Sequence, residues 1–187
     1  MWWAALLNNL VALLGTAGGG AGAGDYESIQ TVTVGSGGEA SITFSSIAAD
    51  WKHLQIRVFA SPTTADVFMK FNGDGTTTNY SRHYLYGDGS AADGGGVYND
   101  ANLSVGYYST TSGIFGASVV DVLDYASTSK NKVTRGLSGG DANGSGLMVL
   151  YSGSRNLTNA ITSITIFPTG AGTFREHSSF ALYGIKG

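Results

Sequence analysis

The sequence lacks cysteine altogether, and it has little proline and little charge. Without cysteine there is no disulfide bridge, no thiolate metal ligand and no cysteine nucleophile. Charged residues make up 12% of the chain, about half the usual share of roughly 25%. With 11% aromatic residues as well, the chain is unlike a disordered one, which combines high charge with few aromatics. Its 187 residues suffice for one domain with a real core.

Clustered positive charge is also missing. The ten Lys and Arg residues are scattered along the chain, and the formal net charge is -3. Proteins that bind nucleic acids neutralise phosphates with grouped basic side chains, so we expect no nucleic-acid partner. The longest apolar segment, at the N-terminus, would form a helix about 20 Å long, too short to span a membrane core of about 30 Å.

Residues suited to catalysis or metal binding show no useful spacing. Asp121 and Asp124 are three apart, which places them on opposite faces of a strand. Residues 72–75, Asn-Gly-Asp-Gly, offer a single carboxylate, and turn chemistry explains them better than a calcium site does. We therefore predict no enzymatic activity, no metal and no cofactor. The histidines are also far apart in the sequence: His53, His83 and His177.

The first 14 residues differ from the rest of the chain. Their apolar positions recur with a period near 3.6, which predicts a short helix over 1–14. Such a helix is marginal alone in water, so we interpret it as an anchor or oligomerisation helix that needs a partner. Two other interpretations stay open, a signal peptide without a basic start and a core helix of the next domain. The expected anchor residues are Trp2, Trp3, Leu6, Leu7, Leu10, Leu13 and Leu14.

Residues 15–24 consist of glycine, alanine and one threonine, which is typical of a flexible linker. The sequence thus divides into an anchor helix (1–14), a linker (15–24) and a β-domain (25–187). This layout suits a tethered, displayed domain.

The β-domain is rich in turn residues that separate short β-branched and aromatic runs. These runs predict about ten short strands in a β-sandwich or jelly roll. Residues 117–123 are apolar on both faces, as expected of a strand covered on both sides. A long glycine-rich loop is expected over 87–99. The expected strands are 31–34, 40–44, 54–58, 67–71, 80–86, 103–108, 117–123, 132–137, 146–151, 162–167 and 179–185.

Tyrosines gather near the expected loops of the second third of the chain. Aromatic faces on a β-sandwich can stack on sugar rings, but they also pack loops and join subunits. We favour packing and subunit contact and keep glycan binding as the alternative. The candidate aromatic residues are Tyr84, Tyr86, Tyr107 and Tyr108.

Several stretches together resemble a recurrent family of small structural proteins of phages and prophages. The ending SSFALYGIKG (178–187) is the most specific. The likeness covers about residues 26–187 and departs at 48–50, where Ala-Ala-Asp replaces a more typical proline. The segment before residue 26 is outside the shared pattern. The other matching stretches are YESIQTVTV (26–34), SITFSSI (41–47), WKHLQIR (51–57), FNGD (71–74), NYS (79–81) and VDVLDY (120–125).

The resemblance implies a jelly-roll module of a virion, placed on a capsid, tail fibre or tail tip, with no catalytic residues to carry over. It also implies a homo-oligomer, with a trimer favoured, and a major capsid or tail protein as partner. We expect a capsid-decoration (cement) or head-fibre protein anchored by its N-terminal segment. The alternative is a tail-fibre or tail-tip subunit that binds a glycan of the host surface.

Overall fold

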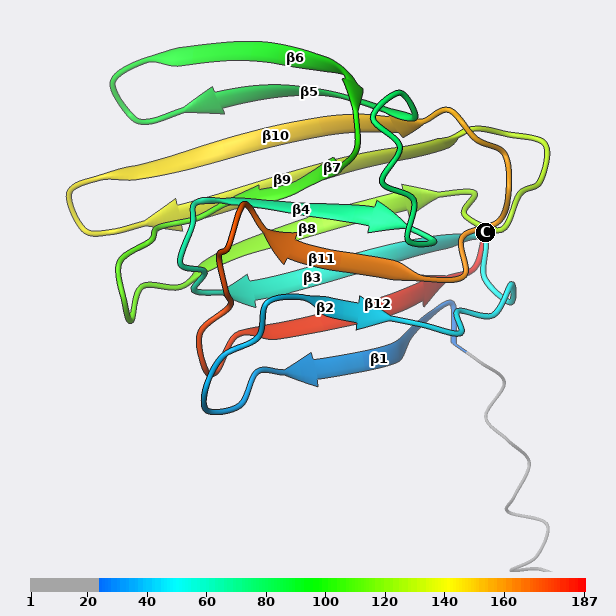
Figure 1. Ribbon diagram of the computed structural model, residues 1–187, viewed down its shortest axis with the longest axis horizontal. Coiled ribbons are helices and arrows are strands. Elements are labelled where there is room, and N and C mark those ends of the chain that lie inside the picture. Colours follow the sequence, from blue (N-terminus) through cyan, green and yellow to red (C-terminus); the bar gives the residue numbers. More distant parts are fainter. Residues whose placement is uncertain (1–23) are drawn as a thin grey trace, which may run out of the picture.

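The computed structural model describes residues 24–187 (Figure 1). Within this range the chain forms twelve strands in two antiparallel sheets and no helix, which confirms the all-β prediction. No helix of this part is long and apolar enough to cross a membrane. The expected helix over 1–14, with its seven anchor residues, lies outside the described residues, as does nearly all of the linker.

The large sheet has eight strands and the small sheet has four. In order of pairing, the large sheet contains β1 (Tyr26–Thr33), β12 (Ser179–Ile185), β3 (His53–Ala60), β8 (Gly116–Leu123), β9 (Lys132–Asp141), β10 (Gly146–Arg155), β5 (Tyr80–Gly87) and β6 (Ala92–Asp100). The small sheet contains β2 (Ile42–Phe44), β11 (Ile164–Pro168), β4 (Asp66–Phe71) and β7 (Leu103–Tyr107).

The strand order is that of a jelly roll with two additional hairpins. Without β5, β6, β9 and β10, the remaining strands form the two sheets β1-β12-β3-β8 and β2-β11-β4-β7. The hairpin β5–β6 is inserted between β4 and β7, and the hairpin β9–β10 between β8 and β11. These four insert strands extend the large sheet past β8, and β7, the edge strand of the small sheet, packs against β10 and β9, so that β6 lies farthest out (Figure 1).

The hydrophobic core lies between the two sheets and belongs to the jelly-roll strands. Along β3, Leu54, Ile56 and Val58 are buried and alternate with outward-facing residues, as the sequence pattern predicts. Burying a side chain of this size contributes about 1.5–3 kcal/mol. Of the four insert strands, only the first residue of β5, Tyr80, belongs to the core cluster. The inserts therefore add surface to the molecule and little to its core.

The C-terminal motif that carries the resemblance alternates across β12. Phe180 and Leu182 are fully buried, and the ring of Phe180 meets Phe174 edge to face at 4.6 Å between centroids. Gly184 lies under the indole of Trp51, where any side chain would collide with the ring. Packing thus accounts for Phe180, Leu182 and Gly184 of the motif.

The expectation of a glycine-rich loop over 87–99 is wrong. Only residues 88–91 form a turn, and the rest is strand β6, which pairs with β5 along its length. Three consecutive glycines, 94–96, hide the side-chain alternation by which strands are recognised. Backbone N–H and C=O groups make the same ladder bonds whatever the side chain, so the pairing survives the missing pattern.

Candidate functional site

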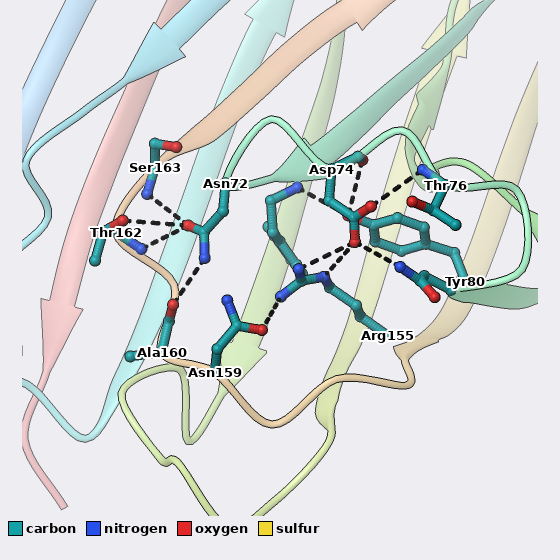
Figure 2. A network of polar contacts seen from close by, with 11 residues as sticks. Asn72, Asp74, Thr76, Tyr80, Arg155, Asn159, Ala160, Thr162 and Ser163 are labelled. Carbon is teal, nitrogen blue, oxygen red and sulfur yellow. Dashed lines mark hydrogen bonds and ion pairs between the residues drawn. The ribbon is translucent and has the colours of Figure 1, made fainter.

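A polar network fastens the base of both inserts to the jelly roll (Figure 2). The guanidinium of Arg155, at the end of β10, forms an ion pair of 3.0 Å with Asp74, in the connection from β4 to β5. Arg155 is 2% exposed, so this pair is held away from water. Asp74 also accepts hydrogen bonds from the Asn79 side chain at 3.0 Å and the Thr76 N–H at 3.1 Å. Burial raises the pKa of Asp74, but these hydrogen bonds outweigh it and lower the pKa to about 2.

The same network includes residues 72–75, where the sequence predicts a turn. The Asn72 amide donates to the Ala160 carbonyl at 2.8 Å, and its oxygen accepts from the backbone N–H groups of Thr162 and Ser163 (Figure 2). Asn72 has a φ of 54°, a left-handed conformation that asparagine tolerates better than most residues. Donors already surround the Asp74 carboxylate, as expected of turn chemistry rather than a calcium site.

A cleft opens where the insert strands pass the free edge of the small sheet. It has a volume of about 480 Å³, within the usual range of ligand pockets of roughly 300–1,000 Å³. Its floor is the inner face of β10, β5 and β6, and its wall is formed by β4 and β7. We call it the tyrosine cleft because four tyrosines line it: Tyr84, Tyr86, Tyr107 and Tyr151.

The Tyr84 ring lies over a glycine of the neighbouring strand. Tyr84 pairs with Gly95 across β5 and β6. A Cβ atom added at Gly95 would lie 2.6 Å from the Tyr84 hydroxyl oxygen and 2.8 Å from Cζ, closer than real Cβ contacts allow. Because Gly95 has no side chain, the ring can extend across the strand, and it meets the ring of Tyr86 at 6.3 Å between centroids.

Two charged residues, Arg82 and Asp66, line the cleft, and they differ in whether another side chain pairs with them. Arg82 forms an ion pair of 2.8 Å with Asp100, donates to the Ser104 hydroxyl at 3.2 Å and lies 4.5 Å from the centroid of the Phe68 ring. Asp66 has no such hydrogen bonds among the described residues. Burial raises its pKa, and the charge of Arg82 lowers it in part. The charge of the guanidinium is therefore paired with Asp100, whereas the carboxylate of Asp66 is open to the cleft.

The hydroxyl of Tyr151 stays neutral at ordinary pH. Burial raises the pKa of Tyr151 to about 12, although a hydrogen bond with Ser138 opposes this rise. Tyr151 lies directly beside Tyr84 in the register of β10 and β5. A neutral phenol donates and accepts hydrogen bonds, and is no general base near neutral pH.

Three of the four tyrosines proposed from the sequence meet in this cleft, and the fourth does not. Tyr108 is 1% exposed and its hydroxyl hydrogen-bonds to the Ser118 hydroxyl at 2.6 Å within the core. The proposal of Tyr108 as a surface aromatic is therefore wrong. Tyr107 and Tyr108 are neighbours at the end of β7, so the alternation of a strand sends their side chains to opposite sides. Sequence reasoning missed Tyr151, Asp66 and Arg82, which come from three separate strands.

The opposite face of the large sheet carries exposed aliphatic side chains. Val119, Leu137, Leu150 and Leu85 stand side by side on β8, β9, β10 and β5, and are between 40% and 55% exposed. The next row contains Phe59 and Met148, with the small Ala117 and Gly139 between them. We call Phe59, Leu85, Val119, Leu137, Met148 and Leu150 the outer apolar face.

A polar row borders this face on the same strands. Gln55 donates to Asp121 at 2.9 Å, and Arg135 donates to the other oxygen of that carboxylate at 3.0 Å. The two rows are next to each other because side chains two residues apart share a face of a strand. The expectation that 117–123 is covered on both faces is thus half wrong, since Val119 remains exposed. An apolar patch with a polar rim is typical of a protein contact surface.

Residues suited to metal binding do not gather. Within residues 24–187 no group of three or more His, Cys, Asp or Glu residues could hold a metal ion. His53 accepts a hydrogen bond from the Asp124 N–H at 3.0 Å, and His83 hydrogen-bonds to the Tyr98 hydroxyl at 2.9 Å. Asp121 and Asp124 serve separate ion pairs, with Arg135 and with Lys52 and Lys130 respectively.

No protein-family model matches the sequence, and no curated protein matches it. Among solved structures, the chain is similar to a marine PL-14 alginate lyase from Aplysia kurodai, with 8% identity and a TM-score of 0.31 over 83% of this chain and 80% of that one. It is also similar to the binding domain of botulinum neurotoxin DC, with 8% identity and a TM-score of 0.21 over 83% of this chain and 39% of that one. Likenesses of this size carry no argument about function.

Proposed function

We propose that this chain is a non-enzymatic structural protein of a bacteriophage particle, displayed on the surface as a capsid-decoration or head-fibre protein. The observation that carries the proposal is the outer apolar face. Six aliphatic and aromatic side chains are exposed together on one sheet, and covering them with another protein surface is favourable because it removes apolar area from water. An assembly protein needs such a surface. The resemblance of the C-terminal motif and the other quoted stretches to phage structural proteins supports the same role.

Within this proposal the outer apolar face joins copies of the chain to one another. A two-fold pair would place the face of one copy on the same face of the next, whereas a trimer needs it to meet a different surface of its neighbour. The apolar segment 1–14 attaches the assembly to a major capsid or tail protein, and residues 15–24 provide reach. Several weak anchors on one oligomer then bind a regular lattice far more tightly than a single anchor does.

The self-association test compares two lysine variants of the full chain by sedimentation velocity. Leu150→Lys places a charge inside the outer apolar face and is expected to shift the oligomer to monomer, because an unpaired charge cannot be buried in an apolar contact. Ser152→Lys adds the same charge on the same face of β10, two residues away in the polar row, and is expected to keep the oligomer. Unchanged association of Leu150→Lys would contradict the contact.

The virion role itself is tested by cryo-electron microscopy of the intact particle. Density for the β-sandwich on the capsid lattice, with residues 1–14 against a shell protein, is the expected result. Density at the tail end would overturn decoration of the capsid. A particle without this chain would overturn the structural role altogether.

A further inference from the structure

We propose that the tyrosine cleft binds a neutral saccharide, with the ring of Tyr84 as the platform on which a sugar ring stacks. Such binding does not follow from a structural role in a particle, and it uses the opposite face of the large sheet from the outer apolar face. The inference therefore stands or falls independently of the proposed virion function.

The platform follows from the position of Tyr84 over Gly95. The C–H groups on one face of a pyranose ring are slightly positive, and the face of an aromatic ring carries the negative part of its quadrupole. Glycine under the ring leaves Tyr84 extended along the cleft floor, next to Tyr86 and Tyr151. A row of aromatic rings beside a half-open hollow suits a chain of sugar rings better than a compact ligand.

The polar groups of the cleft fit sugar hydroxyls. The open carboxylate of Asp66 accepts hydrogen bonds, and sugar hydroxyls are good donors. The hydroxyl of Tyr107 can both donate and accept, so it can match either role of a sugar hydroxyl. Mostly aromatic and aliphatic walls with a few convergent polar groups are the usual composition of a ligand site.

The charges of the cleft exclude acidic sugars. Arg82 is its one cationic lining residue, and its charge is already paired with Asp100 while its guanidinium lies 4.5 Å from the centroid of the Phe68 ring. A uronate or sialate carboxylate would find no free cation there and would be repelled by Asp66. We therefore commit to neutral hexoses and N-acetylhexosamines as the ligand class.

The cleft binds without hydrolysing. Glycoside hydrolysis ordinarily needs two carboxyl groups on either side of the bond that breaks. Among the residues that line the cleft, Asp66 is the single carboxylate. Neither Tyr151, whose hydroxyl stays neutral, nor the paired Arg82 replaces the second carboxylate.

The test is an array of neutral hexose and N-acetylhexosamine oligosaccharides, together with uronate and sialylated oligosaccharides, probed with the full chain. The best-bound neutral oligosaccharide is then titrated calorimetrically. We expect neutral ligands to bind and acidic ones not to bind. Binding restricted to acidic oligosaccharides, or to none on the array, would overturn the proposal.

Matched variants locate the site. Tyr84→Ala is expected to weaken binding about tenfold, because it removes the stacking platform. Tyr98→Ala is the control, since Tyr98 belongs to the same hairpin but points to the opposite face and is 66% exposed. Tyr84→Phe keeps the ring and should bind within about twofold of the natural chain.

A second change tests the polar part without touching a ring. Asp66→Asn is expected to weaken a neutral ligand about tenfold, because hydrogen bonds to a charged acceptor are stronger than those to an amide. Unfolding midpoints of all variants show that each one is folded. If Tyr84→Ala and Asp66→Asn both bind as the natural chain does, the cleft is not the site.

Discussion

The eight jelly-roll strands and the four insert strands differ in how much they contribute to the hydrophobic core. On β3 and β12 every second residue is buried under the small sheet, and these strands supply the core. Most of β6 is exposed, and the insert strands share one residue, Tyr80, with the core cluster. The jelly-roll strands therefore supply most of the hydrophobic core, whereas the inner face of β9 and the end of β10 bury mainly polar side chains such as Lys132, Thr134 and Arg155.

Outward-facing residues of the large sheet form rows that run across both regions. On β3 and β8, Gln55, Arg57 and Asp121 are polar, as expected of a sheet face in water. In the row that starts at Arg57, however, Val119 of β8 and Leu137, Leu150 and Leu85 of the inserts are aliphatic and about half exposed. Solvation alone favours polar residues at such positions, and this row is the surface through which we propose that copies of the chain meet.

The largest expected effect breaks the attachment between the two regions. Asp74→Asn removes the charge that faces Arg155 but keeps the shape of the side chain. The buried guanidinium would then lack its partner, which costs about 3–5 kcal/mol of unfolding free energy. Urea unfolding should show a lower midpoint with an unchanged slope.

Arg135→Gln is the control for that change. It breaks an ion pair with Asp121 in which Arg135 is 72% exposed, so the loss should stay below about 1 kcal/mol. Equal losses in the two variants would mean that the network at the base of the inserts is no stronger than a surface pair.

A smaller expected effect concerns a glycine that lies under an aromatic ring in each of the two regions. Gly184 lies under Trp51 in the jelly roll, and Gly95 lies under Tyr84 in the inserts. Alanine at either position overpacks the ring, which costs about 1–3 kcal/mol. Trp51 packs against the core and has little room to move, whereas Tyr84 borders an open cleft. Gly184→Ala should therefore lose more stability in urea than Gly95→Ala, and the reverse order would contradict this division.

The sequence predicts most strands of both regions because their chemistry is local, although β1 (Tyr26–Thr33) is expected only over 31–34. Residues such as Leu54, Ile56 and Val58 alternate with polar ones, and turn residues follow each run. The insert strand β6 was missed because 94–96 are glycines, which show no alternation. Its identity depends on pairing with β5, a contact that no local pattern records.

The candidate site could be foreseen only in part. Tyr84 and Tyr86 share a face by their spacing, so their meeting follows from period two. Tyr151 and Asp66 reach the cleft through strand order, which is set by non-local pairing. The exposed outer face was hidden as well, since an apolar strand looks the same whether or not a second layer covers it.

The smallest expected effect concerns acid. The pKa of Asp74 is about 2 in the folded chain, below its ordinary value of 3.8. A carboxyl group whose pKa is lowered by folding stabilises the folded state at every pH above its pKa in the unfolded chain. This contribution is lost as the pH falls from about 4 to about 2. At the upper end of this window most folded molecules still carry the charge, so the loss is a fraction of that in Asp74→Asn. Urea midpoints measured from about pH 5 to about pH 2 should fall less steeply for Asp74→Asn than for the natural chain, because the variant has no carboxyl to protonate there. Parallel curves would mean that carboxyl groups elsewhere in the molecule control its acid stability.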